Sequence, residues 1–495
     1  MSEELVAIDA GTTGVTAILF DLDLRPVRKA YREFPQSFPR PGWVEHSATD
    51  ILAAVDATLA ELWSAGPVGE VAGVGITNQR ETVFALDVGT GAALAPGIVW
   101  QDRRTSERCA ELRAEGFEPR VRAKTGLVLD PYFSATKVEW LLEHGRGVRD
   151  AARAGRVRFC TVDALIVQHL TRGERCATDP TNASRTMLFD IEERGWSEEL
   201  CALFGVDPRW LPEVLPSAGD FGTARLPGGR TAPIRGVAGD QQAALFGQGC
   251  WERGSFKNTY GTGCFLVLNT GSERFDSEAG LLTTLAADRG GDPVYAVEGS
   301  VFSGGSIVQW LRDQLGILES AADSERLARS VPDTGGVFLV PAFAGLGAPY
   351  WDPDARAGLL GMTRGTSRAH VVRAALEAIA FQCAEVVELL RADTGLAVDS
   401  LLVDGGASAN DFLLQCQADL AGLEVVRPRN VETTARGAAA LAGVGIGAWS
   451  DPAQAGAFAE EGARFRGALD PEERRARLAA WRAAVARVLT RAARG

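Results

Sequence analysis

The chain has 495 residues, which is too many for one hydrophobic core, so we expect two or more domains. Its hydrophobic content of 46% and charged content of 23% are typical of a globular protein. The formal net charge of −13 at pH 7 argues against a surface that binds nucleic acid or an anionic membrane.

Eight cysteines are spread along the chain without a CxxC pair, so the sequence indicates neither a zinc site nor a redox motif. A chain of this length gains little from disulfides, which favours buried free thiols in a reducing cytoplasm. The sequence starts Met-Ser-Glu-Glu, without a basic or apolar leader, and it contains no apolar run long enough to span a membrane. We therefore expect a cytoplasmic protein with no membrane span.

The stretch from Val6 to Asp21 consists of two apolar runs on either side of a Gly-Thr-Thr-Gly turn at residues 11–14. This pattern predicts a β-hairpin whose turn exposes hydroxyl and backbone N–H groups. Glycines let a backbone approach an anion closely, and successive N–H groups form an anion-binding concavity. Asp9 ends the first strand, and a carboxylate beside a phosphate site implies a bridging Mg²⁺. For this stretch alone, an ordinary hairpin with an acidic strand end remains the alternative.

The next elements are a helix over residues 51–64 and a buried strand over 71–77. Arg80 and Glu81 follow that strand, and ligand sites in α/β sheets gather at the carboxyl ends of strands. Adjacent donors and acceptors of this kind suit a polyhydroxyl substrate. A surface ion pair at a strand end is the alternative.

Four further segments come before the middle of the chain. Residues 97–100 are predicted to form a strand, and Tyr132 precedes a helix and could lend its hydroxyl to a site. Residues 179–187 are interpreted as a polar loop for which the residues indicate no mechanism. Residues 221–233 are rich in Gly and Pro and are predicted to be an exposed connection.

Asp240 begins a predicted helix of small residues directly after a strand. An Asp in this position is most often an N-cap, but the same place can hold a catalytic carboxylate rigidly. Residues 258–267 then repeat the opening pattern of strand, Gly-Thr-Gly turn and apolar strand. The recurrence, about 250 residues after the first copy, predicts two halves of similar build that hold a nucleotide between them.

The second half is predicted to contain a strand over residues 338–341 and a long helix over 371–390, capped by Ser367. A third glycine turn, at 403–410, leaves room for a flat base or ribose. A helix of small residues over 435–441 suits close packing at a domain seam.

A C-terminal helix begins at Asp470 with Pro at its first position. Its apolar stripe favours a docked helix over a membrane-surface helix, because the net charge opposes anionic lipid.

Several of these segments together resemble the FGGY family of carbohydrate kinases, and in particular its glycerol-phosphorylating members. The resemblance runs almost from end to end of the chain. It is carried by GITNQRE (75–81), DPYFS (130–134), TNASRTM (181–187), AGDQQAALFG (238–247), NTYGTGCF (258–265) and VDGGASAN (403–410). It implies an α/β, two-domain actin-like (ribonuclease H-like) ATPase fold with ATP in an interdomain cleft. The implied domains are residues 1–248 and 249–495.

The resemblance also implies roles for individual residues. Asp240 is the implied general base, and Asp9 is the implied Mg²⁺ ligand. The residues implied to bind glycerol are Arg80, Glu81, Tyr132, Asp240 and Gln241, with Trp100 and Phe265 as apolar walls. The residues implied to bind the nucleotide are Thr12, Thr13, Gly14 and Thr262 at the phosphates, and Gly305, Gln309, Gly406 and Asn410 at the adenosine.

The implied partners are glycerol and MgATP, and the implied assembly is a homodimer or homotetramer. The alternatives are a kinase of the same family for another small polyol or a pentulose, and a non-catalytic nucleotide-binding protein on the actin-like fold. The chain departs from the family at Ala10, Gly14, Val15 and Thr16, where Gln, Ser, Ser and Arg are usual. The missing arginine removes a cation near the phosphates, so we expect weaker or differently shaped nucleotide contacts.

Overall fold

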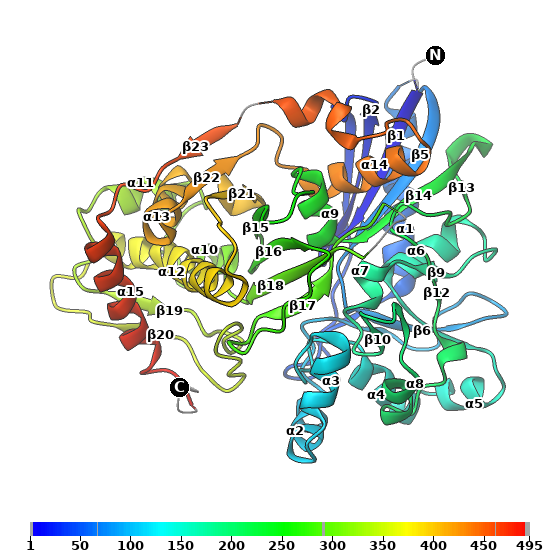
Figure 1. Ribbon diagram of the computed structural model, residues 1–495, viewed down its shortest axis with the longest axis horizontal. Coiled ribbons are helices and arrows are strands. Elements are labelled where there is room, and N and C mark those ends of the chain that lie inside the picture. The colour runs from blue at the N-terminus through cyan, green and yellow to red at the C-terminus, as the bar shows by residue number, and fades with distance from the viewer. Residues whose placement is uncertain (1–2, 67, 290–292, 461, 491–495) are drawn as a thin grey trace. The chain divides into compact units, whose positions relative to one another are not determined.

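The computed structural model describes residues 3–66, 68–289, 293–460 and 462–490 (Figure 1). The chain forms two compact units. Unit 1 comprises Met1–Gly249, Thr283–Tyr295 and Thr433–Ala459, and unit 2 comprises Cys250–Leu282, Ala296–Glu432 and Glu460–Gly495. The chain therefore returns to unit 1 twice after it has first left it.

Unit 1 is built on a six-stranded sheet of order β13-β14-β5-β1-β2-β3. Its strands are β1 (Glu3–Ala10), β2 (Gly14–Asp21), β3 (Pro26–Glu33), β5 (Glu70–Asn78), β13 (Thr223–Arg225) and β14 (Thr231–Gly239). The predicted hairpin is confirmed as β1 and β2, with Ala10 opposite Val15 at the turn. The prediction of an exposed connection over residues 221–233 is wrong, because this segment contributes β13 and the start of β14 to the sheet. Phe221 is fully buried there, which supplies the apolar anchor.

The rest of unit 1 consists of small sheets and helices around this layer. A four-stranded sheet of order β4-β7-β6-β8 comprises β4 (Glu45–His46), β7 (Gly97–Ile98), β6 (Val83–Asp87) and β8 (Val157–Thr161). Short strands pair as β9 (Ala177–Thr178) with β12 (Glu213–Val214), and β10 (Phe189–Asp190) with β11 (Gly195–Trp196). The helices are α1 (Ala48–Ser64), α2 (Ser106–Ala114), α3 (Glu118–Thr125), α4 (Ala135–His144), α5 (Val148–Arg153), α6 (Val162–Leu170), α7 (Pro180–Ala183), α8 (Glu198–Leu203), α9 (Asp240–Gly247) and α14 (Thr433–Gly445).

Helices α1, α6 and α14 all pack against the large sheet of unit 1. Helix α1, whose N-cap Ser47 accepts a hydrogen bond from the backbone N–H of Asp50, packs against β2 and β3. Helix α14 packs against β1, β5 and β14 (Figure 1). Its approach is so close that a methyl group on Gly75 would lie 2.1 Å from the carbonyl oxygen of Ala438. The small residues predicted at 435–441 thus serve the contact of a helix with a sheet.

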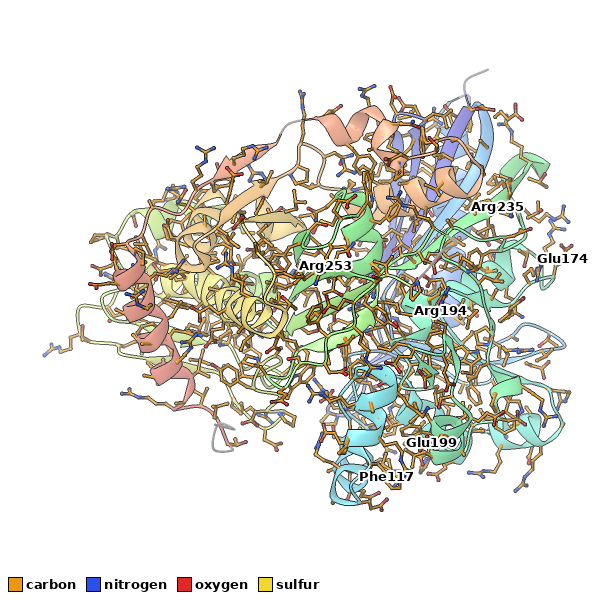
Figure 2. All side chains as sticks on the ribbon, in the orientation of Figure 1. Phe117, Glu174, Arg194, Glu199, Arg235 and Arg253 are labelled. Carbon is orange, nitrogen blue, oxygen red and sulfur yellow. The ribbon has the colours of Figure 1, made fainter. Side chains whose placement is uncertain are left out.

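The segment Thr283–Tyr295 is tied into unit 1 by polar and apolar contacts. Asp288 forms an ion pair of 3.8 Å with Arg194, whose side chain is labelled in Figure 2. The Tyr295 hydroxyl donates to the carbonyl of Ile191. These contacts join elements that are far apart in the sequence, so no local pattern predicts them.

Unit 2 repeats the strand arrangement of unit 1, with the order β18-β16-β15-β21-β22-β23 in its sheet. Across each sheet, an antiparallel hairpin (β2–β1 or β16–β15) lies beside two strands parallel to its second member (β5 and β14, or β21 and β22). An antiparallel edge strand (β13 or β23) then completes the order. The predicted similarity of the two halves is therefore confirmed. The strands of this order are β15 (Phe256–Tyr260), β16 (Cys264–Gly271), β18 (Tyr295–Val301), β21 (Ser400–Asp404), β22 (Glu424–Arg427) and β23 (Ala463–Phe465). Most of β17 (Leu282–Leu285) belongs to the segment of unit 1 that starts at Thr283.

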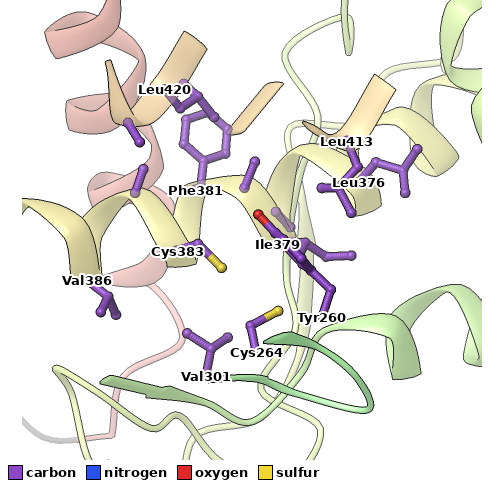
Figure 3. Close-up of a cluster of buried hydrophobic side chains, with 14 of the residues drawn as sticks. Tyr260, Cys264, Val301, Leu376, Ile379, Phe381, Cys383, Val386, Leu413 and Leu420 are labelled. Atoms are coloured by element: carbon purple, nitrogen blue, oxygen red, sulfur yellow. The ribbon is translucent and has the colours of Figure 1, made fainter. Parts of the chain in front are cut away.

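Helix α12 (Arg368–Thr394) runs through the core of unit 2 and begins at Ser367, as predicted, in a capping box with His370. Figure 3 shows its Ile379 and Cys383 beside Tyr260 and Cys264 of the β15–β16 hairpin. The remaining elements are α10 (Gly305–Asp313), α11 (Asp323–Arg329), α13 (Asp411–Ala421), α15 (Pro471–Val485), β19 (Phe338–Val340) and β20 (Gly358–Leu360).

The C-terminal helix α15 is docked, as predicted, with Leu478, Trp481 and Val485 buried. The Trp481 ring stacks on Phe381 of α12 with centroids 5.2 Å apart, and its indole N–H donates to Glu385 at 2.7 Å. Within the described part of the chain, no helix is long and apolar enough to cross a membrane. All eight cysteines are free thiols, as predicted, and six of them are buried.

Candidate active site

A cluster of charged side chains in unit 1 lies where β5 and β14 end. The two strands are parallel neighbours, and Gly239 at the end of β14 is paired with Asn78 at the end of β5. Arg80 follows β5 and Asp240 is the first residue of α9, so the strand ends bring the two side chains together. The Arg80 Nε atom lies 3.3 Å from Asp240 Oδ1. The Arg80 side chain is 1% exposed and that of Asp240 is 29% exposed, so a buried cation supports an accessible carboxylate.

Arg80 is held at several points in this cluster. Its Nη1 donates to Gln242 Oε1 at 3.1 Å, and its Nη2 donates to the Tyr132 hydroxyl at 3.3 Å. Gly239 leaves room for this side chain, because a methyl group there would lie 2.7 Å from the Arg80 Cδ atom. The alternative of a surface ion pair at the strand end is wrong, because Arg80 and Glu81 are both buried.

Glu81 is held by a second arginine. Arg185 Nε donates to Glu81 Oε1 at 2.7 Å, while Arg80 Nε lies 3.8 Å from the same oxygen. Glu81 has a φ of +61°, a left-handed conformation that costs free energy for a residue with a side chain. Its backbone carbonyl accepts a hydrogen bond of 2.8 Å from Ser134, which supports this conformation. Such backbone strain is found mainly at functional sites.

Tyr132 is positioned by contacts on both sides of its backbone. Its N–H donates to Asp130 at 2.8 Å, and its carbonyl accepts from the Lys137 ammonium nitrogen at 3.0 Å. Asp130 is in turn paired with Arg103 at 2.7 Å. Lys137 is fully buried, and burial lowers its pKa to about 7, although the carboxylates of Asp102 and Glu81 oppose the shift. These hydrogen bonds fix the position of the Tyr132 backbone, which its predicted role in substrate binding requires.

Trp100 connects this cluster to the first hairpin turn. Its ring meets that of Tyr132 edge to face, with centroids 5.7 Å apart. Its indole N–H donates to the Thr12 hydroxyl at 3.0 Å. The predicted strand over residues 97–100 is shorter than expected, since β7 ends at Ile98. Trp100 therefore lies outside the strand, where its side chain contacts the cluster. The structure therefore brings Arg80, Glu81, Trp100, Tyr132 and Asp240 together.

The segment 179–187, interpreted as a polar loop, is the part of the site that sequence reasoning missed. It is buried and contains helix α7, whose N-cap Asp179 accepts hydrogen bonds from Thr181, Asn182 and Ser217. Burial raises the pKa of Asp179 to about 7, against the effect of these donors. The Asp-Pro start of α7 is a helix signal that could have been recognised.

This segment reaches the site at two points. The Thr181 hydroxyl accepts from the backbone N–H of Gly239 at 2.8 Å, directly before Asp240. Arg185 is the partner of Glu81 and lies over the Phe133 ring, with the guanidinium carbon 5.3 Å from its centroid. The segment therefore holds the Glu81 carboxylate and the backbone directly before Asp240.

The first hairpin turn offers the groups expected of a phosphate site. Thr12 and Thr13 are in the turn, Gly14 begins β2, and the turn carbonyl of Gly11 accepts from the Gln79 side chain at 3.0 Å. Asp9 lies at the end of β1 and is partly exposed. No group of three or more metal-binding side chains occurs among the described residues. A single carboxylate beside a phosphate site still fits Mg²⁺, which is bound largely through water and substrate phosphates.

The second hairpin turn, in unit 2, is closed by the start of α10. The carbonyl of Thr262 accepts from the backbone N–H groups of Gly304 and Ser306, and that of Gly261 accepts from Gly305. A methyl group on Gly305 would lie 2.8 Å from the Gly261 oxygen, so the two backbones need a glycine here. Phe265 follows on β16, and Gln309 lies on α10. The structure therefore brings Thr262 and Gly305 together.

The third glycine turn joins β21 to α13. Gly405 has a φ of +84°, and a methyl group there would lie 2.5 Å from the Tyr260 carbonyl oxygen. Around Gly406, by contrast, a methyl group would meet nothing within 4 Å. Asn410 caps α13 by accepting from Leu413 at 3.0 Å. The expected room for a base or ribose beside Gly406 stays a prediction.

Gln241 is joined to the cluster through its backbone. It lies on α9 beside Asp240 and is buried, and its backbone N–H donates to Asp240 Oδ1 at 2.7 Å. This hydrogen bond orients the Asp240 carboxylate at the start of the helix. Because Gly239 is the N-cap of α9, Asp240 is not the N-cap that the sequence alone would suggest.

The chain matches two family models, namely the N-terminal domain of the FGGY family of carbohydrate kinases over residues 5–247 and the C-terminal domain over residues 256–446. It is 49% identical over 486 residues to a glycerol kinase of Shewanella piezotolerans, covering 98% of this chain and 99% of that protein. It is 52% identical over 491 residues to a glycerol kinase of Symbiobacterium thermophilum, covering 98% of each.

Solved structures show the same two-domain fold. A Plasmodium falciparum glycerol kinase with ADP matches with a TM-score of 0.91 at 34% identity, covering 99% of both chains. A xylulose kinase from Rhodospirillum rubrum matches with a TM-score of 0.82 at 26% identity, covering 98% of both. The predicted fold class and family are thus confirmed, and the chain belongs to the FGGY family of carbohydrate kinases.

Proposed function

We propose that this protein transfers the γ-phosphoryl group of ATP to a primary hydroxyl of glycerol, forming sn-glycerol 3-phosphate. The main support is the ion pair between the buried Arg80 and the accessible Asp240 carboxylate, in which Arg80 Nε lies 3.3 Å from Asp240 Oδ1. The relatives named glycerol kinase, which match nearly the full length at about half identity, support the same substrate.

In the proposed reaction Asp240 accepts the proton of the attacking hydroxyl and directs its oxygen toward the phosphorus. Phosphoryl transfer depends on positioning and on neutralising charge, so one oriented carboxylate suffices as the base. Arg80 orients Asp240 and donates to glycerol, together with Tyr132 and Gln241, while Glu81 accepts from a glycerol hydroxyl. Trp100 is the proposed apolar wall against the carbon chain, and Phe265 of unit 2 keeps the same predicted role.

We assign the phosphates of ATP to the two hairpin turns, through Thr12, Thr13 and Gly14 in unit 1 and Thr262 in unit 2. Backbone N–H groups in glycine turns stabilise phosphate charge without a cost of reorganisation. Gly305, Gln309, Gly406 and Asn410 are proposed for the adenosine. Asp9 would hold Mg²⁺, which supplies charge neutralisation on the phosphates when bound.

The test is a coupled assay of ADP formation with glycerol, dihydroxyacetone, xylulose and ribulose as acceptors. We expect the highest kcat/KM with glycerol, because the Arg80–Glu81 pair beside the aromatic wall of Trp100 suits a three-carbon polyol. A higher kcat/KM with either pentulose would replace the proposed acceptor within the same family. A protein that binds ADP but shows no acceptor-dependent turnover would instead be a non-catalytic binding protein.

We also propose a homodimer or homotetramer located in the cytoplasm. The eight free thiols support a reducing compartment. Light scattering coupled to size-exclusion chromatography measures the assembly, and a monomeric mass would contradict it.

A further inference from the structure

Tyr31 lies in one row with the proposed Mg²⁺ ligand across three strands of unit 1. Asp9 of β1 is directly opposite Thr16 of β2, and Thr16 is directly opposite Tyr31 of β3. Residues that are directly opposite in neighbouring antiparallel strands point to the same face of a sheet. Tyr31 therefore shares the sheet face of Asp9, at the end of the sheet where the first hairpin turn lies.

The Tyr31 ring leans from this row toward the turn. Gly14 precedes Thr16 by two residues and so faces the same side of the sheet. A methyl group on Gly14 would lie 2.7 Å from both the hydroxyl oxygen and the Cε2 atom of Tyr31, and 2.6 Å from the Arg32 carbonyl oxygen. The tyrosine thus occupies the space that a side chain at Gly14 would fill.

The Tyr31 hydroxyl is placed to meet a ligand. Tyr31 is 42% exposed on the edge strand of the sheet. Among the described residues, none forms a hydrogen bond with the Tyr31 hydroxyl. Within the turn, the Thr12 hydroxyl already accepts a hydrogen bond from the Trp100 indole N–H.

We propose that the Tyr31 hydroxyl donates a hydrogen bond to a phosphate oxygen of the bound nucleotide. This inference rests on the proposed function, because that function places the phosphates at the turn. Neither Gly14 nor Thr16 carries a positive charge, and Gly14 also lacks a hydroxyl. The donor to the phosphate therefore comes from Tyr31 on the neighbouring strand β3. A hydrogen bond to a charged acceptor is stronger than one between neutral groups, which makes a phenol an effective substitute.

The experiment compares Tyr31→Phe with the unchanged protein, using isothermal titration calorimetry with MgADP. The substitution keeps the ring over Gly14 and removes only the hydroxyl. We expect the Kd for ADP to rise about tenfold, as for loss of one hydrogen bond to a charged group, and the KM for ATP to rise with it. The KM for glycerol and the thermal unfolding temperature without nucleotide should not change.

Tyr295→Phe is the matched control, because it removes a hydroxyl of the same unit that is bonded to Ile191. It should leave the Kd for ADP unchanged. An unchanged Kd for ADP in Tyr31→Phe, in a protein that phosphorylates glycerol, would overturn this inference alone. Failure to phosphorylate glycerol, with ADP binding that still depends on Tyr31, would overturn the proposed acceptor and leave this inference standing.

Discussion

The Nε atom of Arg80 and the Oδ1 atom of Asp240 lie 3.3 Å apart although the two residues are separated by most of unit 1 in the sequence. The contact exists because β5 and β14 are parallel neighbours that end at the same edge of the sheet. A buried guanidinium at this edge fixes the direction of a carboxylate that remains accessible. Substitutions in this cluster, and in the residues that support it, should therefore have effects that can be measured.

Asp240→Asn should lower kcat with glycerol about a thousandfold, because the amide cannot accept the proton of the attacking hydroxyl. Glycerol binding should stay measurable, since the amide retains the size and a hydrogen-bonding oxygen of the carboxylate. Steady-state kinetics and calorimetry with glycerol measure the two effects. Asp220→Asn, at an exposed carboxylate paired with Arg235 in the same unit, is the control and should keep full activity. Normal turnover in Asp240→Asn would exclude Asp240 as the base.

Arg185→Met should destabilise the protein by about 3–5 kcal/mol, because it leaves the buried carboxylate of Glu81 with less compensation. The KM for glycerol should rise as Glu81 loses its fixed position. Urea denaturation and kinetics measure these effects. Arg175→Met breaks an exposed pair with Glu213 and should cost at most about 1 kcal/mol. Equal stability losses in the two variants would show that the buried pair has no special role.

Lys137 should make stability depend on pH in the alkaline range. Its pKa is about 7 in the folded protein, against 10.5 for an ordinary lysine, so the cost of burying the charge is fully present below about pH 7. Between about pH 7 and 10.5 the unfolded chain binds the extra proton, so stability rises with pH by up to about 1.4 kcal/mol per pH unit.

Lys137→Met removes this dependence. The unfolding free energy of the unchanged protein, relative to that of Lys137→Met, should therefore increase as the pH rises from about 7 to about 9. Urea denaturation at several pH values measures it. A constant difference would show that Lys137 keeps its proton throughout this range.

Gly75→Ala should destabilise unit 1 by about 1–3 kcal/mol or more, because the added methyl group would lie 2.1 Å from the Ala438 carbonyl oxygen of α14. The helix would have to move away from β5. Gly195→Ala is the matched control, since a methyl group there meets nothing within 4 Å. Thermal unfolding of both variants gives the comparison, and a Gly75→Ala protein as stable as Gly195→Ala would contradict the close packing.

Local patterns predicted those elements whose signals lie within a few residues. The β1–β2 hairpin, the Ser367 cap of α12 and the Asp470 start of α15 were all predicted correctly. The segment 179–187 was not, because its polar residues are satisfied by partners far away in the sequence. Asn182, for example, exchanges hydrogen bonds with Asn78 across 104 positions. The division of the chain into two domains near residue 248 stays a prediction. The two later segments of unit 1, Thr283–Tyr295 and Thr433–Ala459, join it through packing between residues distant in the sequence.

By itself, the sequence determined the repeated hairpins, the family and the identity of the candidate acid and base groups, because these depend on short motifs and local turn chemistry. The tertiary structure alone decided which of those groups meet. It buried Arg80 behind Asp240, placed Arg185 against Glu81 and set Tyr31 over Gly14. The physical reason is that sheet order and register bring together residues distant in the chain, and no local pattern encodes either one.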